Sequence, residues 1–361
     1  MTGIESLTTE RKRIVEVLRK LVEIPTPTGK EERLHKFLSS FLERTGFQVE
    51  VQEIPNYRPN LVGRRGKGNL LFCTHIDTVP GFDHPQAYKL RLEGENLIGR
   101  GVVDPKGQIA SLLVALEKTE APCQVAFTSG EEEEALGSKF LQVEARQGIV
   151  LEPTELSLAL TQAGAIDIEV KVEGKSAHGS VPHKGENAIL KAFRTYQKLE
   201  KMEFLKLTHP HFPKGGWVNL GKIEGGKDIM VVPYRCHFEA DIGIVPGVNV
   251  EKAIEEIKNV TAQDGVTVNF RDISPPIEIR SDLKVVKVLK ESFRKVVGEE
   301  IQVKGMPSWT DAQYLFEKGI QCVVFGAGKL SRAHSNCELV SLRELELLSL
   351  ILVRLLNAWG G

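Results

Sequence analysis

The chain has 361 residues, of which 41% are hydrophobic and 26% charged, and its formal net charge is −1. This length exceeds one ordinary domain, so we expect two, and the composition is that of a soluble globular protein. The balanced charge lacks the basic excess that binding to nucleic acid or to an anionic membrane requires, so we expect neither partner. Five dispersed cysteines without a CxxC pair are typical of the reducing cytoplasm, where we expect the protein to be located.

Helical periodicity marks both ends of the chain. Residues 1–20 form an expected amphipathic helix that Thr8 or Thr9 can cap, and they carry too many charges for a signal peptide. A second helix is expected over 31–46. The apolar stretch 345–359 is interrupted by Arg354, so we expect a helix that packs on the core and does not span a membrane.

Short apolar strands alternate with helices through the first part of the chain and again near its end. The expected strands are 47–54, 60–64, 70–75, 124–129, 149–151 and 322–326, with a helix at 108–118. Strands that alternate with helices predict an α/β fold with a mostly parallel central sheet.

The pattern changes near residue 161. Residues 165–174 alternate with period two, and this strand begins the order strand, helix, strand, strand, helix, strand. This order is the ferredoxin-like arrangement. We therefore predict a catalytic domain formed by residues 1–160 and 277–361, interrupted by an inserted domain at 161–276.

Histidine and acidic residues follow successive predicted strands of the catalytic domain. They are His75, Asp77, Asp104, the glutamates 131–134, Glu152 and His334. In open α/β sheets the ligand crevice lies just beyond the C-terminal ends of the strands. A glutamate run by itself is usually a solvated helix start. Five such places together predict a metal centre, because hydrolytic zinc sites use these side chains.

Several motifs occur in an order that covers nearly the whole chain: THIDTVPG, GRGVVDPKG, TSGEEEEALGS, LEPT, KSAHGSVPHKGENAI and AHSNCE. Together they resemble the acetylornithine deacetylase, succinyl-diaminopimelate desuccinylase and glutamate carboxypeptidase family of dizinc hydrolases. The resemblance implies a zinc-peptidase-like catalytic domain interrupted by a ferredoxin-like domain through which two copies dimerise.

The resemblance also implies the ligands of two divalent metal ions. His75 and Glu152 would hold one ion, Glu132 and His334 the other, and Asp104 would bridge them. Zinc is the expected metal, with cobalt as a substitute. In the family, the peptide bond after the bridging aspartate is typically cis, and here the next residue is Pro105, which lowers the cost of that form. We therefore predict a cis Asp104–Pro105 bond.

Three further roles follow from the resemblance. Asp77 would orient the imidazole of His75, Glu131 would be the general base, and His178 would stabilise the oxyanion in the partner subunit's active site. Counting back from Gly137-Ser138 selects the first two glutamates of the run as functional. The remaining two are expected to be ordinary acids in the first turn of a helix.

The resemblance is weaker at the substrate carboxylate. Many relatives carry an Asn where this chain has Met230, and an Arg where it has Ile242 and Gly243. The candidate replacements are Arg235 and Asn219 and the backbone amides of Gly326 and Gly328.

The expected function is metal-dependent removal of an acyl group from a small N-acyl amino acid by a cytoplasmic homodimer, with N-acetylornithine as the first candidate. Alternatives among enzymes are succinyl-diaminopimelate desuccinylase, N-acetyl-lysine deacetylase, and a dipeptidase or carboxypeptidase. A catalytically silent binding protein on this scaffold is disfavoured because Glu131 is present. A single structural zinc is disfavoured because the candidate ligands exceed the four that it needs.

Overall fold

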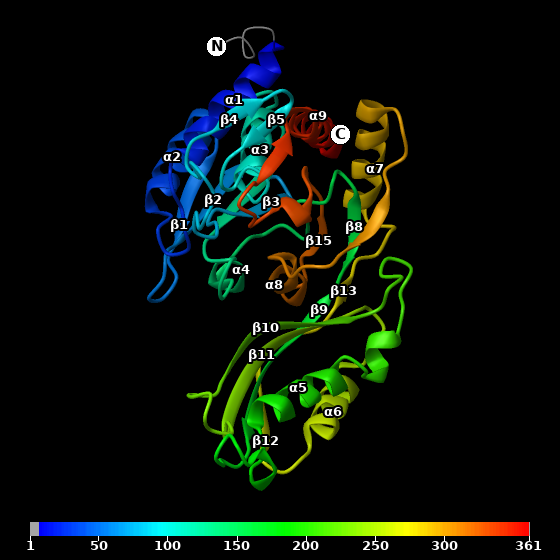
Figure 1. The fold of residues 1–361 in the computed structure, drawn as a ribbon. Coiled ribbons are helices and arrows are strands. Elements are labelled where there is room, and N and C mark those ends of the chain that lie inside the picture. The colour runs from blue at the N-terminus through cyan, green and yellow to red at the C-terminus, as the bar shows by residue number, and fades with distance from the viewer. Residues whose placement is uncertain (1–6, 361) are drawn as a thin grey trace. The chain divides into compact units, whose positions relative to one another are not determined.

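The computed structural model describes residues 7–360, so residues 1–6 of the first expected helix lie outside the described residues. The chain divides into two compact units (Figure 1). The first unit contains the residues up to 160, then 279–304 and those from 310 onward, and the second contains 161–278 and 305–309. The short segment 305–309 thus groups with the second unit, although it follows residue 277, where we expected the catalytic domain to resume.

A mixed sheet, built mostly from residues of the first unit, has the strand order β1-β2-β6-β3-β7-β15-β8-β13, with β14 beside β8. Strand β3 pairs in parallel with β6 and β7, and β15 in parallel with β7. Strand β3 is buried along its whole length, as its unbroken apolar run predicts. The strands are β1 (Gln48–Gln52), β2 (Asn60–Arg65), β3 (Leu70–His75), β6 (Cys123–Thr128), β7 (Gln147–Val150), β8 (Leu158–Gln162), β13 (Ile277–Glu278), β14 (Val303–Met306) and β15 (Gln321–Val324). The predicted α/β class with a mostly parallel central sheet is confirmed.

Helices pack against this sheet and against one another. Helix α3 is buried on every side and contacts α1 and α9, which is consistent with its almost uniformly apolar sequence. The helices are α1 (Thr9–Val22), α2 (Glu32–Arg44), α3 (Lys106–Leu116), α4 (Leu136–Phe140), α7 (Lys284–Val297), α8 (Ala312–Glu317) and α9 (Leu342–Trp359), with a 3₁₀ turn at Leu330–Arg332. The Thr8 hydroxyl caps α1, and α9 buries one face in the core, both as predicted. Over residues 7–360, no helix has the length and apolar character that a membrane crossing needs.

A small three-stranded sheet was not predicted. Its order is β16-β5-β4, formed by β4 (Arg91–Glu93), β5 (Asn96–Ile98) and β16 (Leu339–Ser341). Strands of three residues are too short to show a period in the sequence. The pairing of β16 with β5 brings the segment after His334 beside the segment before Asp104.

The second unit has the predicted ferredoxin-like order. Its elements are β9 (Gly164–Glu173), α5 (Ala188–Leu199), β10 (Trp217–Gly225), β11 (Arg235–Ile244), α6 (Val250–Thr261) and β12 (Val266–Ser274), with 3₁₀ turns at Pro182–Lys184 and Glu203–Lys206. The strands form one antiparallel sheet in the order β10-β11-β9-β12. Alternate apolar residues of β9 and β11 pack with α5 and α6 into a separate core.

Candidate metal centre

His75 and Asp104 form the buried centre of the candidate site. His75 is the last residue of β3, and its side chain is 1% exposed. Its Nε2 lies 2.8 Å from Asp104 Oδ1 and 3.8 Å from Glu152 Oε1, on the loop after β7. One imidazole nitrogen therefore faces two carboxylates from different parts of the chain.

The second oxygen of Asp104 faces another histidine. His334 Nε2 lies 3.6 Å from Asp104 Oδ2 and 3.0 Å from Glu132 Oε1. His334 has a backbone φ of 60°, which is uncommon for a residue other than glycine, and its side chain is 49% exposed. Ligating atoms of His75, Asp104 and Glu132 all lie within 4.8 Å of one another. Asp104 thus lies between two histidine–glutamate pairs, and the His334 side is the more open one.

Asp77 holds the loop that carries the glutamates. Its Oδ1 accepts hydrogen bonds from the N–H groups of Gly130 and Glu131, both at 3.1 Å, and its Oδ2 accepts one from Glu132 N–H at 3.2 Å. Oδ1 also lies 3.4 Å from His75 Nδ1. Burial alone would raise the pKa of Asp77, but these partners lower it below its ordinary value. Asp77 is therefore an ionised side chain that holds the backbone before and at the first two glutamates and lies beside His75.

The four glutamates of the run differ in burial. Glu131 and Glu132 are half-buried, whereas Glu133 and Glu134 are exposed. Helix α4 begins only at Leu136, so the prediction that the last two occupy its first turn is wrong. They lie in the preceding turn because Ala135 adopts a left-handed conformation that delays the helix.

The chemistry of these residues fits a divalent metal ion. Burial would lower the pKa of His75, but the charge of Glu131 and the carboxylates of Asp104 and Asp77 raise it well above its ordinary value. For Glu152, burial and the Asp104 carboxylate both raise the pKa well above its ordinary value. The buried Oε1 of Glu152 has no hydrogen-bond partner among residues 7–360. So many carboxylates in a buried place require a positive charge. Imidazole nitrogens and carboxylate oxygens are suitable ligands for zinc and similar ions.

Asp104 lies in a turn directly before α3, and the Asp104–Pro105 bond is cis, as predicted. We expected Asp104 to follow a strand of the main sheet, and this is wrong. The preceding strand, β5, belongs to the small sheet instead.

Glu338 is a site residue that the sequence analysis missed. It is 1% exposed, and its two oxygens accept hydrogen bonds from the backbone of Gly101, Val103 and Asp104, while Arg100 forms an ion pair with it at 2.7 Å. The only signal in the sequence is its place four residues after His334 in AHSNCE. Glu338 fixes the backbone that presents the Asp104 carboxylate.

Asp311 is a second missed residue. It is fully buried, and its Oδ2 accepts a 2.5 Å hydrogen bond from Thr128 Oγ1 at the end of β6. Burial raises the pKa of Asp311, and the hydroxyls of Ser138 and Thr128 oppose that rise. The Asp311 carboxylate in turn raises the pKa of Glu131 and Glu152. No pattern in the sequence distinguishes it from an ordinary helix-start acid.

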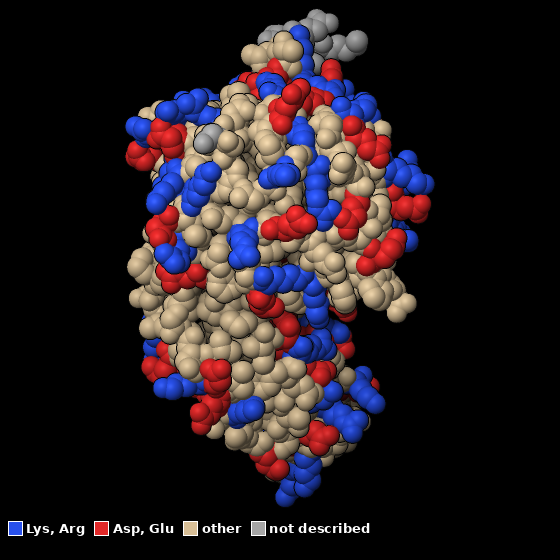
Figure 2. Space-filling model, turned by 180° about the vertical axis from the view of Figure 1, so that it is seen from behind, with Lys and Arg blue, Asp and Glu red and all other residues tan. Residues whose placement is uncertain are grey.

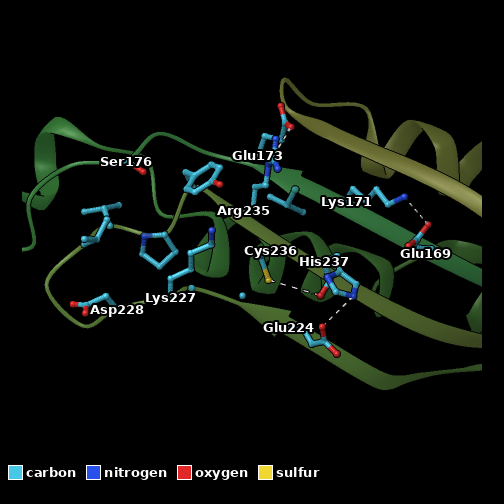
Figure 3. A pocket seen from close by; sticks show the side chains of 17 residues that line it. Glu169, Lys171, Glu173, Ser176, Glu224, Lys227, Asp228, Arg235, Cys236 and His237 are labelled. Atoms are coloured by element: carbon cyan, nitrogen blue, oxygen red, sulfur yellow. Dashed lines mark hydrogen bonds and ion pairs between the residues drawn. The ribbon is translucent and has the colours of Figure 1, made fainter.

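The remaining candidate side chains belong to the second unit, and all of them are exposed: His178, Asn219 and Arg235. Arg235 stacks on Tyr234 at 5.2 Å and lies 3.8 Å from Glu173, beside a cavity of about 690 Å³ (Figure 3). Contact of these three residues with a substrate stays a prediction.

Gly243 has no room for a side chain. A Cβ atom at this position would come within 2.0 Å of the Trp217 ring.

The two glycine amides are not available to a substrate carboxylate. Gly326 N–H donates to Thr154 Oγ1 at 2.9 Å, and Gly328 N–H donates to Glu344 Oε2 at 2.7 Å. The expectation that these amides bind a substrate is therefore contradicted. The sequence could not show that acceptors from distant segments occupy both donors.

Comparison with known proteins agrees with this architecture. The family model described as peptidase family M20/M25/M40 matches residues 71–358. An acetylornithine deacetylase from Myxococcus xanthus is 31% identical over 350 residues, which covers 89% of this chain and 90% of the relative. A probable succinyl-diaminopimelate desuccinylase from Staphylococcus epidermidis is 23% identical over 374 residues, which covers 90% of this chain and 92% of the relative.

Solved structures show the same fold. A tripeptidase from Staphylococcus aureus superposes with a TM-score of 0.81 at 22% identity, covering 97% of this chain and 98% of that one. A metallo-carboxypeptidase from Sulfolobus solfataricus superposes with a TM-score of 0.77 at 17% identity, covering 98% of this chain and 100% of that one. Together with the match of the family model, these findings show that the chain belongs to peptidase family M20/M25/M40 and is a hydrolase.

Proposed function

We propose that this protein is a metal-dependent amidohydrolase that removes an acyl group from an N-acyl amino acid, with N-acetylornithine as the first candidate substrate. The observation that carries the proposal is the position of Asp104, whose two oxygens face His75 at 2.8 Å and His334 at 3.6 Å. The acetylornithine deacetylase from Myxococcus xanthus, at 31% identity, supports the choice of substrate.

The proposed ligands of two zinc ions are His75 with Glu152 and Glu132 with His334, and Asp104 lies between the two pairs. When bound, such ions lower the pKa of a water molecule and polarise the amide carbonyl. The half-exposed His334 leaves one side of the centre open to a substrate.

Glu131 is the proposed general base. Its half-buried carboxyl comes from the same turn as Glu132, and Asp77 holds the backbone of both residues. Burial raises the pKa of Glu131 well above its ordinary value. A carboxylate with a raised pKa can take a proton from water and return it to the leaving amine.

Asp77 selects the tautomer of His75. Its Oδ1, 3.4 Å from His75 Nδ1, favours a proton on that nitrogen and so leaves the lone pair of Nε2 for a metal. In the second unit, Ser180 N–H donates to His178 Nδ1 at 3.1 Å. The proton of His178 is therefore on Nε2, where it can be donated to an oxyanion.

We further propose a cytoplasmic homodimer in which the second unit forms the dimer interface and presents His178 to the partner's site. The five cysteines, all of which are unpaired thiols in the structure, support a reducing compartment. Basic and acidic side chains are interspersed on the face shown in Figure 2, which favours a small-molecule substrate over nucleic acid.

The proposal is tested by amine release. The protein is chelated, reloaded with zinc or cobalt, and assayed with N-acetylornithine, N-acetyl-lysine, N-succinyl-diaminopimelate and a set of dipeptides. We expect metal-dependent turnover of one N-acyl amino acid, a loss of at least about 10²-fold in Glu131→Ala, and near wild-type rates in the matched control Glu133→Ala. Turnover of dipeptides alone would replace the deacylase assignment with a peptidase, and equal loss in both variants would refute the role of Glu131.

A further inference from the structure

The proposed base and one proposed metal ligand lie on a single closed loop, residues 129–137, which we call the glutamate loop. It follows β6 and runs into the start of α4. Two backbone hydrogen bonds close it, from Gly137 N–H to Ser129 C=O at 2.9 Å and from Ala135 N–H to Gly130 C=O at 2.7 Å. Asp77 holds the backbone N–H groups of Glu131 and Glu132 from outside the loop, and the closure of the two loop ends fixes the rest of the loop.

The side chain of Asn60 joins those two ends. Asn60 is the first residue of β2 and is fully buried. Its Oδ1 accepts a hydrogen bond from Ser129 N–H at 3.2 Å, and its Nδ2 donates to the Gly137 carbonyl at 2.8 Å. One amide group thus satisfies a donor before the glutamates and an acceptor after them.

The packing at Gly137 shows how closely the ends approach each other. A Cβ atom at this position would lie 2.5 Å from both the nitrogen and the oxygen of Ser129, and 2.9 Å from Asn60 Oδ1. Any side chain there would push the ends apart. The loop therefore closes only with glycine at one end and with an amide that fits between them.

We propose that Asn60 is a positioning residue that closes the glutamate loop and thereby sets the carboxylates of Glu131 and Glu132. The inference rests on the proposed function, because it assigns the consequence to the metal pair and the base named there. Without Asn60, the buried Ser129 N–H and Gly137 C=O lose their partner, which favours an opened loop. Glu132 would then leave His334, whereas His75 and Glu152, which lie outside the loop, would stay in place.

Metal binding gives a test that does not depend on activity. Zinc is titrated calorimetrically into the chelated wild type, Asn60→Ala and the matched control Asn69→Ala, whose side chain accepts one hydrogen bond from Trp359 Nε1 at 2.8 Å. We expect Asn60→Ala to weaken one of two binding events by about 10- to 100-fold and to leave the other unchanged. The control should bind like the wild type. Unchanged affinity at both sites in folded Asn60→Ala would overturn the proposal.

Kinetics give the second readout. Asn60→Ala should lower kcat by at least about tenfold with little change in KM, when assayed with both metals saturating. If Asn60 acts through Glu131, the same substitution in a Glu131→Gln background should lower the residual rate much less. Full additivity of the two losses would show that Asn60 does not act through Glu131.

Two further variants keep the proposal testable if Asn60→Ala does not fold. Asn60→Asp keeps the acceptor for Ser129 N–H and, as a carboxylate, replaces the donor to Gly137 C=O with an oxygen that repels it. Gly137→Ala opens the same loop from its other end. Both should reproduce the selective loss of one metal, and a general loss of both would refute the proposal. If the wild type hydrolyses none of the substrates, the proposed function fails while the zinc titration still decides the role of Asn60. If the wild type binds a single zinc ion, the two-metal proposal fails. Asn60→Ala should then lower the affinity for that one ion, and an unchanged affinity would overturn the role of Asn60.

Discussion

Glu338 accepts a hydrogen bond from the backbone N–H of Asp104 at 3.2 Å, through the same oxygen that accepts one from Val103 N–H at 2.9 Å. Its other oxygen pairs with Arg100 at 2.7 Å, and both side chains of that ion pair are 1% exposed. The backbone that carries the carboxylate proposed to lie between two metal ions is therefore held by a second, buried carboxylate.

Removing Glu338 should damage both stability and the metal centre. Glu338→Ala leaves Arg100 as an unpaired buried charge, which typically costs about 3–5 kcal/mol. We expect a clearly lower melting temperature and zinc affinity reduced by at least about tenfold. Thermal denaturation and zinc titration measure the two effects, with Glu346→Ala as the control because Glu346 pairs with Arg11 near the surface. A variant with wild-type zinc affinity would show that Asp104 does not need this support.

Bound metal should raise the melting temperature of the protein. Chelation leaves the carboxylates of Asp104, Glu132 and Glu152 without a compensating cation, so the melting temperature should fall. Adding zinc should restore it by mass action, by about 2.7 kcal/mol at one hundred times the dissociation constant. Differential scanning fluorimetry with a zinc series measures this effect. Magnesium, which prefers oxygen ligands, should stabilise less at equal concentration. A melting temperature that is insensitive to zinc would refute the metal centre.

Glu31 should make the free energy of unfolding depend on pH. Burial, with a contribution from Asp77, raises the pKa of Glu31 from 4.5 to about 7, although the Gly29 N–H opposes the rise. Between these two values the folded state binds a proton that the unfolded state releases, so the stability falls as the pH rises from about 4.5 to about 7. Glu31→Gln should flatten this part of the profile and be more stable than the wild type above pH 7.

The profile is obtained from urea unfolding of the chelated protein at each pH. Glu32→Gln is the matched control, since Glu32 is the next residue of the chain and its side chain is exposed. An identical slope in wild type and Glu31→Gln would contradict the raised pKa.

Arg65 should contribute to stability by capping two helices. It is 7% exposed, and its Nη1 donates to Thr45 C=O and Leu116 C=O, both at 3.2 Å, at the C-terminal ends of α2 and α3. Arg65→Met should lower the free energy of unfolding by about 2–3 kcal/mol, because buried carbonyls lose their donor. Chemical denaturation measures the loss. The control Arg64→Met removes a partly exposed ion pair with Glu50 and should cost less than about 1 kcal/mol.

The sequence by itself determined the fold class and the set of candidate ligands. Period-two and helical patterns are local, so they predicted the α/β unit, the ferredoxin-like order and the core faces of α1, β9 and β11 without knowledge of any contact. The types and order of His75, Asp104, Glu152 and His334 pointed to a metal centre because few other side chains bind such ions.

Only the tertiary structure decided what surrounds those ligands. Asn60, Asp311 and Glu338 act through hydrogen bonds to segments that lie far away in the sequence, and such contacts leave no period or spacing to read. The occupied amides of Gly326 and Gly328 were misjudged for the same reason. A local pattern reports which face of an element is buried, but which donor meets which acceptor is fixed only when distant segments pack against each other.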